Sequence, residues 1–167
     1  MDNYCEYMVS RKKSAKDYAF VAGLYVLAAV ISFFALAVKY IGVFICAAAF
    51  YGAYYFSQNA FKEFEYILTG TDIDVDLIIA KSRRKRLLSL EGNEITLIAG
   101  VNDERHSHRQ KEHYDKVIDA QSHYNNSEVY FVTFEKDGKG ILYFEPSDKM
   151  LEMLKKQMPN KVFIKTK

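Results

Sequence analysis

The chain has 167 residues, two cysteines and a formal net charge of +2 at pH 7. This length leaves room for one modest domain beside two long apolar segments. From residue 62 onward, 18 basic residues balance 18 acidic ones. That neutrality argues against a nucleic-acid-binding domain, which needs a net basic surface. Cys5 and Cys46 are too few to form a disulfide framework.

Residues 1–17 precede the first long apolar segment and are predicted to form a short amphipathic juxtamembrane helix. Tyr4 and Met8 recur at helical spacing, and four basic residues follow them: Arg11, Lys12, Lys13 and Lys16. Such a segment is expected to lie at the lipid headgroups, with its basic side chains against anionic lipid. A partner-binding segment is the alternative.

Two uncharged apolar runs follow, at about residues 18–38 and 40–61, separated by Lys39. Each run is about 20 residues long, which is the length that a helix needs to cross the hydrocarbon layer. Neither run has the polar face of a water-soluble helix, and the first is too long for a signal peptide. Residues 18–61 are therefore predicted to form a transmembrane hairpin of two helices. Basic residues flank the hairpin at both ends, which predicts a cell-membrane protein with both termini in the cytoplasm.

Small residues gather on the second predicted helix at Ala48, Ala49, Gly52 and Ala53. The pairs Ala48–Gly52 and Ala49–Ala53 have the spacing that lets two helices approach closely. The first helix of the same hairpin is the expected packing partner. A second copy of the chain is the alternative.

Residues 62–167 are predicted to form six or seven mainly antiparallel strands followed by one helix. Residues 72–77 alternate strictly between aspartate and an apolar residue, which is typical of a half-buried strand. A calcium loop would need a glycine and a closing glutamate, which this segment lacks. Asp137 and Gly138 predict a tight turn between two aromatic, β-branched runs. Residues 147–158 have one apolar face and precede Pro159, as expected for a C-terminal helix.

Five basic residues occupy six consecutive positions: Lys81, Arg83, Arg84, Lys85 and Arg86. They are predicted to form a turn that runs into a strand ending near Leu90. Two roles remain open for them. They could pair with the aspartates of residues 72–76 on the preceding strand, or they could bind anionic lipid at the inner leaflet.

A polar loop at about residues 102–113 raises the question of a metal site. The candidate ligands are His106, His108, His113 and His123, with Asp115 or Asp119 as partners in a metal-dependent hydrolase. No cysteine accompanies the histidines, and no serine or cysteine stands in a recognisable catalytic frame. The expectation is therefore no catalytic residue, no metal and no cofactor.

The order of elements after residue 62 resembles that of PH-like domains, and the matching segments are residues 66–69, 73–75 and 87–90. The whole layout is similar to a group of uncharacterised two-helix membrane proteins of Gram-positive, clostridia-type bacteria. The residues that carry this similarity are Met1-Asp2, Arg11-Lys12-Lys13, Lys16-Asp17, Phe144-Glu145-Pro146-Ser147 and Pro159-Asn160-Lys161-Val162. The resemblance implies a PH-like fold but no activity.

Together these patterns predict an α+β membrane protein whose cytoplasmic PH-like domain spans residues 62–167. Its expected role is non-catalytic: a membrane-anchored module that binds a protein or a lipid headgroup. A small accessory subunit of a membrane transport or secretion complex is the alternative. Besides the lipid bilayer, the expected partners are a membrane protein or a second copy of the chain, and no nucleic acid. The sequence does not identify the ligand, the oligomeric state or the biological process.

Overall fold

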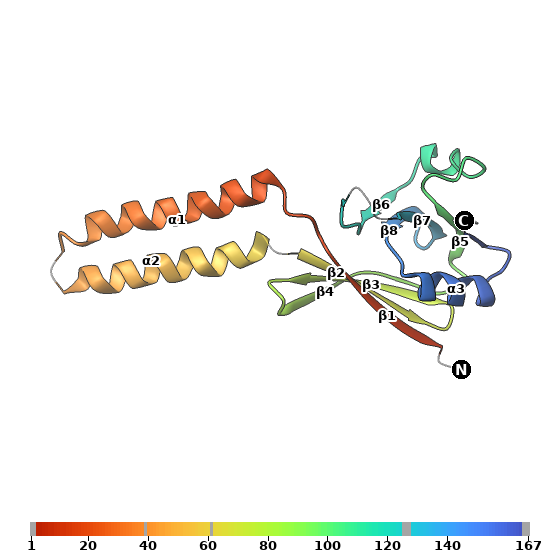
Figure 1. The fold of residues 1–167 in the computed structure, drawn as a ribbon, viewed down its shortest axis with the longest axis horizontal. Coiled ribbons are helices and arrows are strands. Elements are labelled where there is room, and N and C mark those ends of the chain that lie inside the picture. Colours follow the sequence, from red (N-terminus) through yellow and green to blue (C-terminus); the bar gives the residue numbers. More distant parts are fainter. Residues whose placement is uncertain (1–2, 39, 61, 125–127, 165–167) are drawn as a thin grey trace. The chain divides into compact units, whose positions relative to one another are not determined.

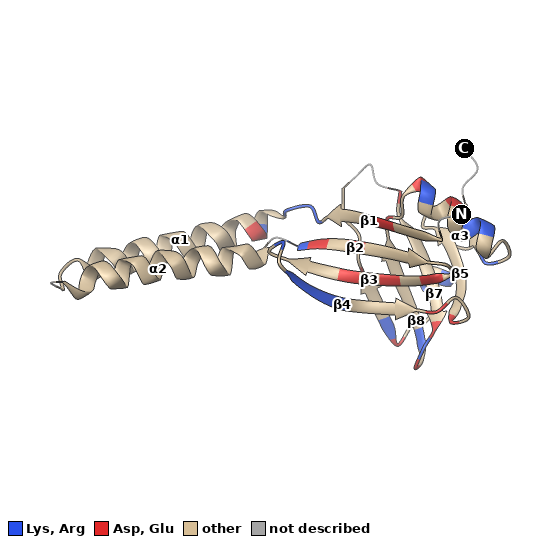
Figure 2. Ribbon diagram, turned by 90° about the horizontal axis from the view of Figure 1, so that it is seen from below, with Lys and Arg blue, Asp and Glu red and all other residues tan. Residues whose placement is uncertain are grey.

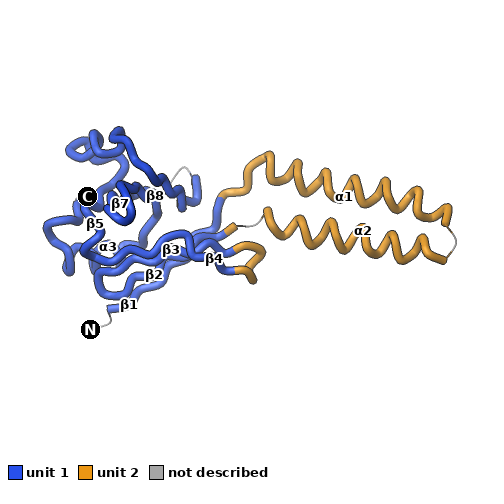
Figure 3. The backbone as a smooth tube through the Cα atoms, turned by 180° about the vertical axis from the view of Figure 1, so that it is seen from behind, with its two compact units in different colours: residues 1–11, 63–78, 84–167 blue, residues 12–62, 79–83 orange. Residues whose placement is uncertain are grey.

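The computed structural model describes residues 3–38, 40–60, 62–124 and 128–164. The chain divides into two compact units, shown in Figure 3. The first, called here the helical unit, comprises residues 12–62 and 79–83. The second, called the β unit, comprises residues 1–11, 63–78 and 84–167. Each unit is described by itself.

The helical unit consists mainly of α1 (Ala15–Ala35) and α2 (Ile41–Ser57), followed by the short η1 (Gln58–Ala60). A capping box begins α1, because the Ser14 hydroxyl accepts from the Lys16 N–H and the Ser14 N–H donates to the Asp17 carboxylate. The spans 15–35 and 41–60 are long and apolar enough to cross a membrane, with mean hydropathies of 2.1 and 1.2. Most of their large apolar side chains are exposed.

The two helices pack against each other along one narrow face of each (Figure 1). Ala28 and Ala35 are buried on this face of α1. At the start of α2, a Cβ added to Gly42 would lie 2.2 Å from the Ala35 carbonyl oxygen. The backbones therefore approach so closely at this crossing that it requires glycine at position 42.

The described strands of the chain form two sheets (Figures 1 and 2). The first sheet has the order β1-β2-β3-β4, with the bounds Tyr4–Ser10, Lys62–Thr69, Asp72–Ile79 and Arg83–Leu90. The second has the order β6-β8-β7-β5-β9, with β5 at Ile95–Gly100, β6 at Lys116–Asp119, β7 at Tyr130–Glu135, β8 at Lys139–Phe144 and β9 at Val162–Phe163. The predicted antiparallel pairing holds for most neighbours, but β6 pairs with β8, and β5 with β9, in parallel.

The prediction of a juxtamembrane helix before the hairpin is wrong, because Tyr4–Ser10 form the strand β1. This strand pairs antiparallel with β2, and Ser10 lies opposite Glu63. Cys5 and Val9 are buried in the core. A spacing of four residues suits one face of a helix and one face of a strand alike, which is why the pattern misled. The helical hairpin is consequently an insertion between two paired strands.

One hydrophobic core is shared by the two sheets and the helix α3 (Asp148–Gln157). The Ser147 hydroxyl accepts from the Met150 N–H at the start of α3, as expected for an N-cap. The predicted apolar face of this helix, Met150, Leu151 and Leu154, is buried in that core. The α+β fold with a C-terminal helix is thus confirmed.

A second, smaller apolar cluster lies on the opposite face of the second sheet. It contains Leu97, Ala99, Phe131 and Ile141, and Val101 and Tyr114 from the following loop pack on it. His106 of the same loop stacks on Phe163, with ring centroids 4.3 Å apart. The polar loop therefore covers a sheet face.

Candidate functional site

The predicted basic turn is shorter in the structure than the sequence suggested. Residues 80–82 make the turn, and Arg83 already begins β4. Ala80 and Lys81 have φ angles of 57° and 55°, and the Ser82 N–H donates to the Ile79 carbonyl at 3.2 Å. Two consecutive positive φ angles are normally supplied by Asn-Gly or Gly-Gly. A lysine side chain is instead held at the tip of this hairpin, at a cost in backbone strain.

Arg84 and Arg86 pair with carboxylates of the same sheet. Both terminal nitrogens of Arg84 lie 3.0 Å from the oxygens of Glu65. Arg86 contacts Asp76, and it also lies 2.5 Å from Asp74. Glu65 and Asp76 are buried, so their charges depend on these guanidinium groups. The pairing that the sequence left open is thus present for Arg86, whereas Asp72 instead accepts from the Gly92 N–H.

A second carboxyl group approaches Glu65 from β1. Burial raises the pKa of Glu65, and a hydrogen bond with Glu6 raises it further. The same hydrogen bond, together with one from Tyr4, lowers the pKa of Glu6. The two carboxyl groups therefore titrate as a pair, with the pKa of Glu65 above its ordinary value and that of Glu6 below it. The outer face of the first sheet is a closed network of charges in which each buried carboxyl group has a partner.

The remaining basic residues of the cluster are placed differently. Arg83 donates to the Tyr55 hydroxyl of α2, and its guanidinium carbon lies 5.0 Å from the centre of that ring. Lys81 and Lys85 are exposed and make no hydrogen bond or ion pair with any residue that the structure describes. These two lysines are available to a charge outside the chain.

A groove follows the outer edge of β4 in the β unit. Its volume is about 250 Å³, and its walls come from β4, from the start of β6 and from the β7–β8 turn. The lining residues are Arg86, Leu87, Leu88, Ser89, Asp115, Lys116, Lys136, Asp137 and Gly138. Lys136 reaches across to the Ser89 carbonyl at 2.8 Å and to Glu94 at 3.2 Å. Residues distant in the sequence thus meet at the groove between the two sheets.

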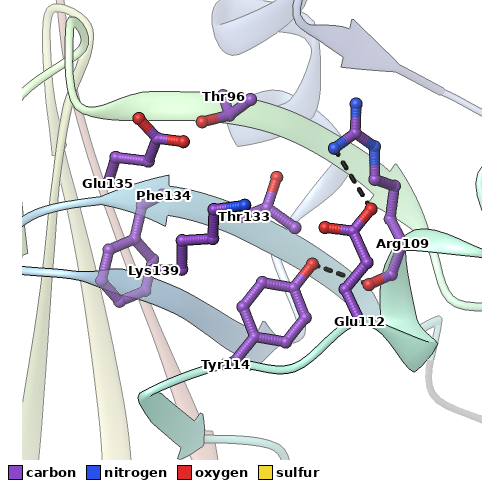
Figure 4. Close-up of a pocket in the computed structure, with 8 residues that line it drawn as sticks. All are labelled: Thr96, Arg109, Glu112, Tyr114, Thr133, Phe134, Glu135 and Lys139. Atoms are coloured by element: carbon purple, nitrogen blue, oxygen red, sulfur yellow. Dashed lines mark hydrogen bonds and ion pairs between the residues drawn. The ribbon is translucent and has the colours of Figure 1, made fainter.

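Figure 4 shows a second, smaller pocket over β7 and β8. Tyr114 donates to the Arg109 carbonyl at 2.6 Å, and Arg109 pairs with Glu112 at 3.3 Å. The buried Thr133 hydroxyl has no partner among the described residues, and the Lys139 side chain reaches toward it. The cavity measures about 20 Å³, which is room for one water molecule. It is too small for an organic ligand.

The histidines do not gather into a metal site. His106 lies 3.3 Å from Asp103, and His123 lies 3.2 Å from Asp119. Among the residues that the structure describes, no three His, Cys, Asp or Glu side chains are placed to share a metal ion. Hydrogen bonds from Arg105 lower the pKa of Asp103 to about 2. Asp103 is the carboxylate that Arg105 and His106 share within this loop.

The four small residues of α2 separate into two faces. Ala53 is buried and Ala49 partly so, on the side of α2 that packs against α1. Ala48 is exposed, and a Cβ on Gly52 would meet no atom within 4 Å. The Ala49–Ala53 pair therefore lies toward α1, and the Ala48–Gly52 pair does not.

A protein-family model matches nearly the whole chain. The model described as Bacterial PH-like domain (DUF6106) matches residues 1–164. The chain belongs to this family. Because the match includes residues 15–60, the helical hairpin lies inside the family's domain. Searches of curated proteins and of solved structures gave no match.

Two features of this PH-like domain are not predicted by the sequence patterns. Glu65, the partner of Arg84, lies between Phe64 and Tyr66 in β2, and the alternating pattern of that strand does not single it out. The groove beside β4 depends on strand order, which local patterns do not reveal. A signal was nonetheless present for Glu65, since a glutamate inside an apolar run usually needs a cationic partner.

Proposed function

We propose that the protein is a non-catalytic PH-like binding module anchored in the cell membrane by α1 and α2. The carrying observation is the exposed apolar surface of the hairpin. Phe33, Phe34 and Phe44 are each at least 70% exposed, on helices of membrane-spanning length. Hydrocarbon would cover this surface, whereas water would leave it as a large aggregation-prone patch.

The strand pairing on either side of the hairpin supports a definite topology. Since β1 and β2 form one ladder, both ends of the inserted hairpin must lie on the same side of the bilayer. Two crossings satisfy this condition. The basic residues at both flanks favour the cytoplasmic side.

Labelling of single cysteines tests this proposal. Cys5 and Cys46 are first replaced, with alanine and serine respectively. Position 42 is unsuitable for a probe because a side chain there would strike Ala35, so the probe is Tyr40→Cys, at a position that is 89% exposed. Lys149→Cys on the exposed side of α3 is the matched probe.

In intact cells, a membrane-impermeant thiol reagent should label position 40 and leave position 149 unlabelled until the cells are opened. Labelling of position 149 outside, with position 40 protected, would reverse the topology. Release of the protein from membranes by high salt or alkaline carbonate would contradict the anchoring itself, because neither treatment extracts a spanning helix.

The binding role of the module is supported by the strained turn. Lys81 occupies a position that glycine would fill with less strain, and it belongs to the same compact unit as the helices. A lysine held there suits an anionic headgroup. In nanodiscs, anionic lipid should slow hydrogen exchange at residues 80–82, and Lys81→Gln with Lys85→Gln should remove that protection. Equal exchange with and without anionic lipid would exclude this contact.

A further inference from the structure

A small apolar cavity lies in the helical unit, between the start of α1 and η1. Its volume is about 90 Å³, and it is lined by Lys13, Asp17, Tyr18, Val21 and Ala60. The lining surface is apolar throughout, so Lys13 and Asp17 contribute only their hydrocarbon stems to its wall. An apolar cavity stays dry and binds apolar groups.

The charged ends of these two lining side chains lie at the rim of the cavity. The Asp17 carboxylate accepts the Ser14 N–H at 2.8 Å in the capping box of α1, so this negative charge is engaged by the start of the helix. The Lys13 ammonium lies 6.0 Å from the centre of the Tyr18 ring. The cavity therefore combines a dry interior with a polar rim.

Basic residues predominate around this end of the hairpin. Apart from Lys39, the helical unit has one acidic residue, Asp17, and six basic ones: Lys12, Lys13, Lys16, Lys62, Lys81 and Arg83. Lys16 and Lys62 flank the lining positions in the chain, and neither makes a hydrogen bond or ion pair with any residue that the structure describes. The uncommitted charge beside the cavity is positive.

The aromatic residues indicate the depth of the cavity in a bilayer. Tyr18 is 61% exposed beside the cavity, and Tyr54 and Tyr55 are exposed at the corresponding end of α2. Exposed tyrosines at the ends of spanning helices lie at the level of the lipid headgroups. An apolar cavity with a basic rim at this level fits a ligand that has a hydrocarbon chain and an anionic head.

We propose that the cavity binds part of one acyl chain of an anionic glycerophospholipid, whose phosphate lies beside Lys16 and Lys62. This inference rests on the proposed membrane anchoring and names the lipid class that the hairpin selects. The site is formed by α1 and η1, so it is separate from the headgroup contact proposed at Lys81. It does not depend on the direction in which the hairpin crosses the membrane.

The test uses the full chain in micelles of an uncharged detergent. Phosphatidylglycerol and phosphatidylcholine with identical acyl chains are titrated in, and native mass spectrometry counts the lipids that stay bound. Glycerol phosphate, which carries the anionic head without a chain, is added as a competitor. This competitor distinguishes a lipid site from a phosphate site.

The chain should retain one phosphatidylglycerol under conditions that remove phosphatidylcholine, and glycerol phosphate should not displace it. Val21→Phe should abolish retention because the ring fills the cavity, whereas Val26→Phe, at a 63% exposed position of the same helix, should not. Lys16→Gln should weaken retention about fivefold, since one attraction to the headgroup is lost. Lys111→Gln removes the same charge from an exposed position of the β unit and should leave retention unchanged.

Ala60→Leu fills the cavity from η1 and replaces Val21→Phe if that variant lowers the helix content measured by circular dichroism. Three results would overturn the proposal. Equal retention of the two lipids would show that charge does not select the ligand, and displacement by glycerol phosphate would show that no chain is bound. Unchanged retention in both cavity-filling variants would place the lipid elsewhere. Cysteine labelling and carbonate extraction test the anchoring separately, so the two proposals can fail independently.

Discussion

The two units differ in how much they expose the same kinds of apolar side chain. Phe131 and Phe144 in the β unit are fully buried, whereas Phe44 in the helical unit is 75% exposed. Apolar composition is therefore no guide to burial in this chain. The β unit hides its large apolar groups and the helical unit displays them, which is the contrast that the proposed membrane anchoring of the helices would explain. Four changes test or sharpen this contrast.

Removal of the helical hairpin should have the largest effect. Because Ser10 and Glu63 face each other in the ladder, a two-residue Asn-Gly turn between them can replace residues 11–62. The product should be soluble without detergent, because most of the exposed large apolar side chains of the described chain belong to the hairpin. Light scattering and circular dichroism measure the result.

A fragment that starts at Glu63 is the matched control for this deletion. It lacks β1, so Cys5 and Val9 are missing from the core. It should unfold at a lower temperature than the turn-closed variant. If both fragments aggregate equally, the β unit does not fold apart from the hairpin, and the contrast between the units fails.

Truncation of one apolar side chain in each unit gives the next effect. Leu154 on α3 is completely buried, so Leu154→Ala should lower the free energy of unfolding of the β unit by about 2–5 kcal/mol. Phe44→Ala on α2 should change it by less than about 0.5 kcal/mol. Denaturant unfolding of the full chain in micelles, followed by signals of the β unit, measures both. Equal losses would show that the two units unfold together.

The basic cluster offers a smaller contrast within one strand. Arg86→Gln leaves the buried Asp76 without its guanidinium and should cost about 1–3 kcal/mol. Lys85→Gln, one residue earlier and exposed, should stay within about 0.5 kcal/mol of the parent protein. The same unfolding measurement distinguishes them. If Lys85→Gln lowered the free energy of unfolding as much as Arg86→Gln, the ion pairs on the first sheet would not be what stabilises β4.

The smallest effect concerns pH. Hydrogen bonds from Arg105 lower the pKa of Asp103 in the folded chain to about 2, from an ordinary value of 3.8. Its contribution to stability is therefore complete above about pH 4 and disappears as the pH falls toward 2. Asp103→Asn should reduce the loss of unfolding free energy between about pH 4 and pH 2. An unchanged loss would show that the loop over the second sheet is not held by this carboxylate.

Local patterns in the sequence predicted the local parts of the fold. The length of the two apolar runs, the Asp137–Gly138 turn and the apolar face of α3 each depend on neighbours in the chain, and the structure contains all three. The strand β1 was missed because four-residue spacing suits two periods. The parallel pairs β6–β8 and β5–β9 join segments that no local pattern relates.

The candidate site was predictable only in part for the same reason. Five adjacent basic residues were evident in the sequence, but their separate roles depend on partners from other elements. Arg83 meets Tyr55, Arg84 meets Glu65, and Arg86 meets two aspartates of β3. Lys81 and Lys85 differ from them only because the fold brings no partner to them among the described residues.

The insertion between β1 and β2 also sets an order of events during synthesis. β1 leaves the ribosome first, but its partner residues follow only after the whole hairpin, since Ser10 pairs with Glu63. Closing so long a loop is slow compared with the local turn between β3 and β4. On the proposed membrane anchoring, the first sheet is completed only when both helices have inserted and returned the chain to its starting side. Under the same proposal, docking of β1 becomes a checkpoint, because a chain in which only one helix has crossed leaves the core without Cys5 and Val9 and exposes it to quality-control proteases.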